Sequence, residues 1–375
     1  MRVKLEDVCE RGSSNIKQSD IIKMSGNYPI YGASGLAGKV NFYHQEQPYV
    51  AVVKDGAGIG RTTLNPAKSS VIGTMQYLIP KKNVLPEYLF YVVSYMHLEK
   101  YYTGATIPHI YFKDYKNEEF NLDNIEKQLE IIDVLGRCKK VIEARKQELV
   151  ELDSLTKARF VELFGDPVAN PMHWPVKRLK ELAIQINSGN TPKGGSENYV
   201  EKGITFFRSQ NVWKDRLEMD DIAYIDEKTH ESMKRSSLKH GDILMTKTGR
   251  INTENSSLGR AALYEGEDDM ANVNGHVYFI RLKEGVNNKF VLRVLASPEY
   301  RDLIRSVCVG GIDKRQLNKE HIEEFPIIYP PSEMIDNYIE FVEQVNKSKF
   351  DTMTFAPIYA IINLYLHTYF YQGRR

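Results

Sequence analysis

The sequence predicts a mixed α+β protein: two similar globular domains separated by long antiparallel coiled-coil helices, as a pseudo-twofold tandem repeat. Three observations support this. The 375 residues exceed one compact domain, two stretches of similar layout follow one another, and a proline-free helical segment lies between them. The predicted parts are a first globular domain (1–121), a first spacer helix (122–165), a second globular domain (166–331) and a short second spacer helix with an atypical aromatic tail (332–375).

The composition is typical of a globular protein with buried cores. Apolar residues make up 42% and charged residues 26%. The three cysteines, Cys9, Cys138 and Cys308, are too widely separated for a disulfide framework or a CxxC metal site, and the histidines lack metal-ligand spacing, so no metal site is expected. The charged N-terminus has no signal-peptide core, which predicts a cytoplasmic protein. The net charge of +1 means that any DNA binding depends on local patches or a more basic partner.

The two globular domains follow the same order of elements. In each, a buried-strand pattern ends at a lysine, Lys54 or Lys247, and a glycine follows two residues later. A Gly-Arg pair comes next and ends at Arg61 or Arg260, which predicts that these positions are equivalent. Each domain then continues with a predicted helix, at 86–101 in the first and 288–307 in the second. The closing stretches are 104–120 and 310–325, in which Phe120 is expected to correspond to Phe325.

A long helix is predicted from Asn124 to Phe164. The segment contains no proline and carries a narrow apolar stripe at helical spacing. Its length would be roughly 60 Å at 1.5 Å per residue. Such a stripe needs a partner, and the matching helix that starts near Ser332 is the candidate. The residues expected to pack between helices or to dock partners are Ile125, Leu129, Ile132, Leu135, Ile142, Leu149, Leu152, Leu155, Leu163, Tyr338, Phe341 and Val345.

The C-terminal segment departs from the pattern of the first helix. No Asp, Glu, Lys or Arg occurs from Thr352 to Gly373, and the segment is aromatic and interrupted by Pro357. It is marginal for a membrane span, which needs about 20 apolar residues, so no membrane contact is expected. A short docking helix or a replaced or frame-altered terminus are the interpretations that remain.

This layout resembles the specificity subunit of type I restriction-modification systems. The similarity extends over residues 1 to about 350 and is greatest at 28–35, at 149–155 running into 159–167, and at 325–331. The resemblance implies two target-recognition domains, each reading half of a split asymmetric DNA sequence. A helix of this length would set their spacing at one or more DNA turns of about 34 Å.

The partners are also implied by the resemblance. They are double-stranded DNA, methyltransferase subunits that dock on the helices and are expected to number two, and restriction subunits reached through the complex. This chain would hold no cofactor, since AdoMet belongs to the methyltransferase subunit and ATP and Mg to the restriction subunit. The short second helix would leave part of the 149–163 stripe uncovered and weaken methyltransferase docking.

The candidate DNA-binding residues are side chains in turn-rich stretches of both domains. Lysine and arginine contact phosphates, and arginine also reads guanine. The alternative for any one of them is an ordinary solvated cation. The candidates are Lys39, Lys54, Arg61, His109, Arg208, Lys247, Arg250, Arg260, Lys314 and Arg315.

Two other functions remain open. The loop from Gly56 to Gly60 follows a strand as AdoMet-binding loops do, so a DNA-modifying enzyme is one alternative. The required helix and acidic residue do not follow, and no Asn/Asp-Pro-Pro-aromatic motif is present, so a structural turn and no catalytic residues are expected. The other alternative is a coiled-coil scaffold that binds protein.

Overall fold

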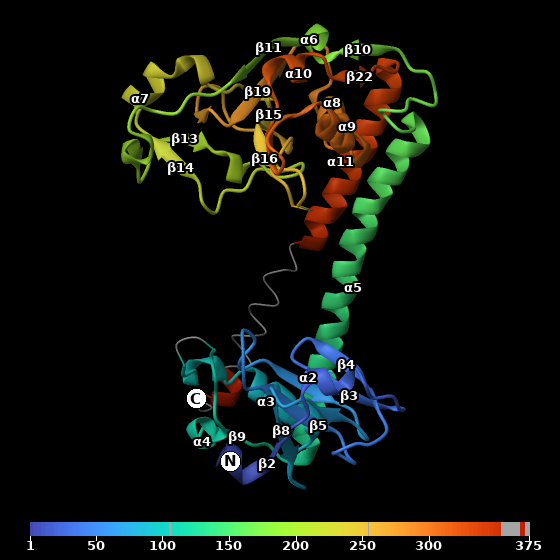
Figure 1. Cartoon of the computed structure of the whole chain (residues 1–375), viewed down its shortest axis with the longest axis vertical. Coiled ribbons are helices and arrows are strands. Elements are labelled where there is room, and N and C mark those ends of the chain that lie inside the picture. Colours follow the sequence, from blue (N-terminus) through green and yellow to red (C-terminus); the bar gives the residue numbers. More distant parts are fainter. Residues whose placement is uncertain (105–106, 254, 354–367, 372–375) are drawn as a thin grey trace. The chain divides into compact units, whose positions relative to one another are not determined.

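The computed structural model describes residues 1–104, 107–253, 255–353 and 368–371 (Figure 1). The chain divides into two compact units. The first contains Met1–Leu149 with the described residues after Lys349, and the second contains Val150–Lys349. Each unit has its own sheets and hydrophobic core, as the repeat predicted.

The main sheet of the first unit is antiparallel in the order β2-β8-β5-β6. Its central strand β5 is buried at every residue because both faces of the sheet are covered. Val50 and Val52 face the cluster that includes helix α3, whereas Tyr49 and Ala51 face a second apolar cluster. The strands are β2 (Cys9–Ser13), β8 (Met75–Pro80), β5 (Tyr49–Val53) and β6 (Thr62–Asn65).

Smaller elements complete the first unit. A three-stranded sheet has the order β4-β3-β7, and β1 pairs with β9. Their bounds are β3 (Tyr28–Gly32), β4 (Gly35–Val40), β7 (Ser70–Val71), β1 (Arg2–Lys4) and β9 (Glu119–Asn121). The helices are α1 (Leu5–Val8), α2 (Gln18–Ile21), α3 (Pro86–Ser94), a 3-10 turn (Leu98–Tyr101) and α4 (Phe112–Tyr115).

The second unit repeats the main sheet of the first. Its order β11-β19-β15-β17 matches that of the first unit, and β15 is again buried throughout. Two further sheets have the orders β12-β14-β13-β18 and β16-β21-β20, and β10 pairs with β22. The strands are β10 (Val176–Arg178), β11 (Ala183–Ser188), β12 (Tyr199–Val200), β13 (Ile204–Phe207), β14 (Ala223–Ile225), β15 (Ile243–Thr246), β16 (Thr248–Arg250), β17 (Ala261–Leu263), β18 (Ala271–Val273), β19 (Val277–Leu282), β20 (Val309–Gly310), β21 (Lys314–Gln316) and β22 (Pro326–Ile328).

Short helices lie between and around the strands of the second unit. They are α6 (Leu179–Leu182), α7 (Glu227–Ser232), α8 (Asn288–Leu295), α9 (Pro298–Val307) and α10 (Lys319–Glu323), with 3-10 turns at Gly195–Asn198, Ser209–Asn211 and Lys234–Ser236. The prediction of one helix at 288–307 was wrong, because Pro298 starts a new helix whose first turn is capped by the Ser297 hydroxyl. The helix predicted at 86–101 likewise ends at Ser94, since His97 adopts a left-handed conformation.

Backbone hydrogen bonds confirm the repeat residue by residue. The Lys54 N–H donates to Thr74 O at 2.9 Å, and the Lys247 N–H donates to His276 O at 2.8 Å. Thr74 and His276 each precede the strand that pairs with β5 or β15, so Lys54 and Lys247 are equivalent, as predicted.

The closing strands correct one detail of the predicted repeat. Phe120 pairs with Val3, and Ile327 pairs with Lys177 at the same position of the second unit. Phe120 therefore corresponds to Ile327 and not to Phe325.

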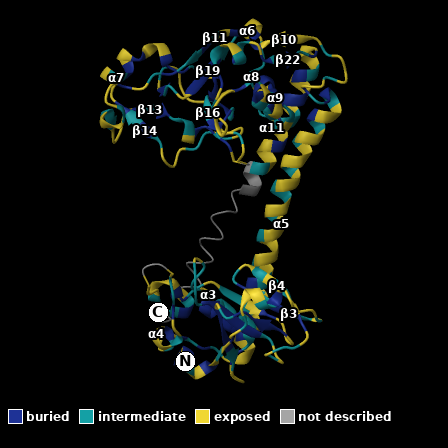
Figure 2. Ribbon diagram, in the orientation of Figure 1, coloured by how far each residue is buried: buried dark blue, intermediate teal, exposed yellow. Residues whose placement is uncertain are grey.

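Helix α5 (Ile125–Phe164) is a single helix of 40 residues, as predicted. The Asn124 side chain caps its first turn, and Gly165, at φ 74°, ends it. Exposed residues predominate along its middle (Figure 2). Leu135 is buried in the core of the first unit, and Leu163 packs against that of the second.

Other stripe residues of α5 have surfaces open to solvent. Ile125, Leu129 and Leu155 are exposed, and Ile132, Ile142, Leu149 and Leu152 are half-buried. Phe160 and Phe164, which were not among the predicted packing residues, are buried in the core of the second unit. The aromatic end of α5 is therefore its anchor in that unit.

Helix α11 (Ser332–Met353) packs antiparallel to the end of α5 within the second unit. Its Tyr338 lies edge-on to Phe164, with ring centroids 5.5 Å apart, and Lys349 forms a 2.6 Å ion pair with Asp153. Residues further along α11 therefore contact residues earlier in α5, which is the order expected of antiparallel helices. Tyr338 and Val345 are buried and Phe341 is half-buried.

The described end of the chain belongs to the first unit. Phe370 is fully buried and lies edge-on to Tyr88 with ring centroids 5.5 Å apart. Tyr369 donates to Asp123 at 3.1 Å. Residues 354–367, which include most of the predicted docking helix, lie outside the described residues. Across the described ranges, none of the helices combines the length and apolar character needed to cross a bilayer.

Candidate nucleic-acid interface

The two equivalent lysines extend from rigidly held backbone. Besides the N–H bonds described above, the Lys54 carbonyl accepts from Ile110 N–H and the Lys247 carbonyl from Leu317 N–H, both at 2.9 Å. Lys54 Nζ lies 3.7 Å from Asp55, and Lys247 Nζ lies 5.7 Å from the centre of the Tyr278 ring. Each ammonium group is partly exposed, and a fixed cation of this kind suits a phosphate contact.

A histidine lies beside Lys54 in the first unit. His109 Nδ1 is 2.7 Å from the Asp55 carboxylate, and the imidazole stacks on Tyr111 with centroids 6.4 Å apart. The imidazole and Lys54 share Asp55 as a neighbour, so the structure brings these two predicted residues together.

The small sheet β16-β21-β20 carries three predicted residues of the second unit. Arg250 pairs in register with Lys314 on the neighbouring strand, and Arg250 forms a 3.3 Å ion pair with Asp313. Arg315 donates to Gly311 O at 3.1 Å and to Cys308 O at 3.4 Å. Arg250 and Lys314 are exposed, so two cations lie side by side on the sheet.

A hollow of about 440 Å³ opens beside these cations. Gly249 is required at its base, because a Cβ there would come within 2.2 Å of Leu258 N. The lining is polar and offers hydroxyl and amide groups to a base edge or a phosphate. Its residues are Thr248, Gly249, Arg250, Thr253, Asn255, Ser256, Ser257 and Lys314.

The equivalent arginines Arg61 and Arg260 have different surroundings. Arg61 is exposed beside Gly58. Arg260 stacks on Trp213 at 3.9 Å and donates Nε to Ser256 O at 3.0 Å and Nη2 to Asn255 O. Burial lowers the pKa of Arg260, and the nearby Arg301 charge adds to the effect. Arg260 therefore holds the polar loop of the hollow in place.

Lys39 lies on another sheet, and Arg208 directly follows strand β13 of another. Lys39 is exposed on β4. Arg208 forms a 3.2 Å ion pair with Asp221 and lies over the Tyr199 ring, and hydrogen bonds from Gln210 and then Arg208 lower the pKa of Asp221. The structure does not bring these two residues together with the strand-end lysines.

Sequence reasoning missed several residues of this region. Asp55 orients His109, and Trp213 supports Arg260. The polar run Thr253, Asn255, Ser256 and Ser257 between two glycines was a usable signal, since such runs form loops that line functional sites.

The Gly56–Gly60 loop forms the turn of a β-hairpin between β5 and β6. Its N–H groups donate within the unit: Gly56 to Pro108 O at 3.0 Å, Ile59 to Gly56 O at 3.2 Å and Gly60 to Val53 O at 2.9 Å. A loop that cradles phosphate leaves such groups free for the ligand. These contacts support the structural-turn interpretation.

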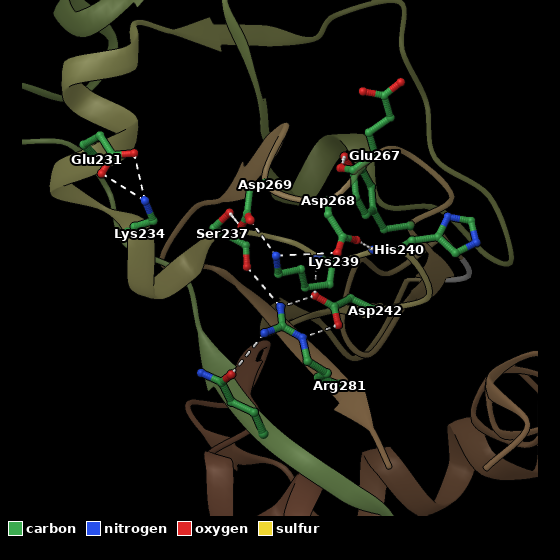
Figure 3. A network of polar contacts seen from close by, with 12 residues as sticks. Glu231, Lys234, Ser237, Lys239, His240, Asp242, Glu267, Asp268, Asp269 and Arg281 are labelled. Carbon is green, nitrogen blue, oxygen red and sulfur yellow. Dashed lines mark hydrogen bonds and ion pairs between the residues drawn. The ribbon is translucent and has the colours of Figure 1, made fainter. Parts of the chain in front are cut away.

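A buried ion pair supports the strand that leads to Lys247. Arg281 on β19 donates Nε and Nη2 to the two carboxylate oxygens of Asp242, at 2.9 and 2.7 Å (Figure 3). Nη2 also donates to Ser237 O at 3.1 Å. Asp242 directly precedes β15, so the bidentate pair joins this strand to its neighbour.

Comparison with known proteins identifies the family. The type I restriction modification DNA specificity domain matches residues 1–153 and again 171–354. The chain belongs to this family, which confirms the resemblance noted from the sequence. The two matches and the observed sheets also confirm the predicted α+β fold with two similar globular domains.

Individual relatives agree with this assignment. The MjaIX specificity subunit of a type I restriction enzyme from Methanocaldococcus jannaschii is 27% identical over 193 residues, which cover 46% of this chain and 44% of that protein. The match thus spans less than half the length of this relative.

Solved structures show the same fold. The S subunit of a type I restriction-modification system from M. genitalium matches with a TM-score of 0.60 and 14% identity, over 100% of this chain and 96% of that one. A structure from work on assembly and conformational transition of the type I R-M system matches with a TM-score of 0.58 and 15% identity, over 98% and 97%.

Proposed function

We propose that this chain is the DNA sequence-specificity subunit of a type I restriction-modification complex. Each globular unit reads one half of a bipartite, asymmetric DNA target. The observation that carries the proposal is the repeated framework, which holds Lys54 and Lys247 by the same backbone hydrogen bonds within a chain of the DNA specificity family.

The differences between the units support an asymmetric target. The second unit extends the counterpart of the β4-β3-β7 sheet by strand β12, and it carries Arg250 and Lys314 beside a polar hollow. The first unit instead places His109 and Asp55 next to its strand-end lysine. Equivalent cations can anchor the DNA backbone, while different neighbouring side chains read different base edges.

The chain itself is proposed to be non-catalytic. AdoMet would bind to the methyltransferase partner, and ATP and Mg to the restriction subunit. Exposed apolar residues on more than one side of α5, among them Leu129, Val141 and Val150, are proposed as contacts for two methyltransferase subunits. The proposed location of the assembled complex is the cytoplasm.

The test is selection of DNA by the complex of this chain with its methyltransferase partner. Sequencing of DNA retained from a random library is expected to return two short conserved runs separated by an unspecified spacer. Enrichment of one continuous run, or of none, would refute the proposal. AdoMet binding by the purified chain alone would refute its non-catalytic part.

A further inference from the structure

The repeated framework places two different polar side chains at one equivalent position. In the first unit His109 forms bridges with Asp55 and with Thr103. In the second unit Gln316 pairs with Thr248 and with Val309. Asp55 and Thr248 each directly follow the strand-end lysine of their unit. Both bridges are antiparallel in each unit, so His109 and Gln316 correspond.

This position adjoins the strand-end lysines. The next residue along the chain donates its N–H to the Lys54 carbonyl in the first unit and to the Lys247 carbonyl in the second. The His109 side chain is 37% exposed, and Gln316 is exposed. Each side chain is thus held on rigid backbone, next to the proposed phosphate anchor and open to solvent.

The two side chains offer different hydrogen-bonding patterns. The Asp55 carboxylate engages His109 Nδ1, and among the described residues Nε2 has no hydrogen-bond partner. His109 can therefore form one directed bond to a base edge. Gln316 has an amide donor and acceptor, with a 3.4 Å contact to Asn318, and a glutamine can read adenine through two bonds.

We infer that His109 and Gln316 are corresponding specificity-determining residues, each reading a base edge in the half-site of its own unit. Asp55 acts as a positioning residue for His109. This inference rests on the proposed function. It assigns base recognition to the position beside each strand-end lysine and phosphate contact to the lysine itself.

The test is methylation sequencing with the complete chain and its methyltransferase partner, using His109→Gln, Gln316→His and Asp55→Asn. His109→Gln is expected to change base preference at one position of one half-site, by on the order of tenfold. Gln316→His should do so in the other half-site only. Asp55→Asn should weaken preference at the His109 position and leave every other position unchanged. His173→Gln, in an exposed loop, is the matched control and should leave the motif intact.

The outcomes separate this inference from the proposed function. If the wild-type complex methylates a bipartite motif and both His109→Gln and Gln316→His leave it unchanged, the inference fails and the proposed function stands. A uniform loss of methylation without any change in base preference also overturns it. A wild-type complex without a bipartite motif overturns the proposed function and the inference together. Because Gln316 is exposed, Gln316→His provides the test even if His109→Gln does not fold.

Discussion

Replacement of Arg281 by methionine is expected to destabilise the second unit by about 3–5 kcal/mol. The side chain of Asp242 is only 1% exposed, and Arg281 supplies two short hydrogen bonds to its carboxylate. Removing the guanidinium leaves a buried charge unpaired, which costs far more than the loss of a surface pair. Burial already raises the pKa of Asp242 despite its bonds to Arg281, so the unpaired carboxylate would be strongly disfavoured.

Denaturant unfolding followed by tryptophan fluorescence measures this effect selectively. Both tryptophans of the chain, Trp174 and Trp213, lie in the second unit. The control is Lys234→Met, which removes an exposed ion pair with Glu231 and should cost less than about 1 kcal/mol. A double variant, Asp242→Asn with Arg281→Met, should recover part of the loss. A cost below about 1 kcal/mol for Arg281→Met, or no recovery in the double variant, would refute the reasoning.

Three further predictions concern the core, the pH dependence and the DNA contacts. Phe370→Ala should destabilise the first unit by about 3–5 kcal/mol because the ring is fully buried, and hydrogen exchange should show the loss there. A hydrogen bond from Lys239 lowers the pKa of Asp269. The Asp269 carboxylate therefore contributes stability above about pH 4, and this contribution is lost on further acidification. Asp269→Asn should make the unfolding midpoint depend less on pH between about pH 5 and 3. Lys54→Gln and Lys247→Gln should each weaken DNA binding by similar factors for all sequences and reduce the salt slope by about 1, whereas a sequence-dependent loss in titrations would contradict the phosphate role.

The sequence was sufficient for the architecture because its signals were local or repeated. The absence of proline and the apolar spacing predicted α5, and the two lysine-containing strand ends predicted the equivalence that backbone hydrogen bonds confirm. Pro298 divides the helix predicted at 288–307 into two. The proline was visible in the sequence, but the prediction followed the continuous apolar pattern instead.

The site was less predictable because it depends on contacts between distant residues. The bond between His109 and Asp55 joins two loops of the first unit, and no spacing rule indicates it. Arg260 matched Arg61 in position, yet stacking on Trp213 gives it a structural role. The partners of a cation decide whether it is available to DNA, and tertiary structure determines those partners.

The central claim is that two units of one framework each read part of a single DNA target. Sequencing of methylated sites in cells that carry this chain with its methyltransferase partner tests it most directly. The account predicts two different short motifs at a fixed separation, with no base preference between them. One uninterrupted motif, or two identical halves, would contradict it.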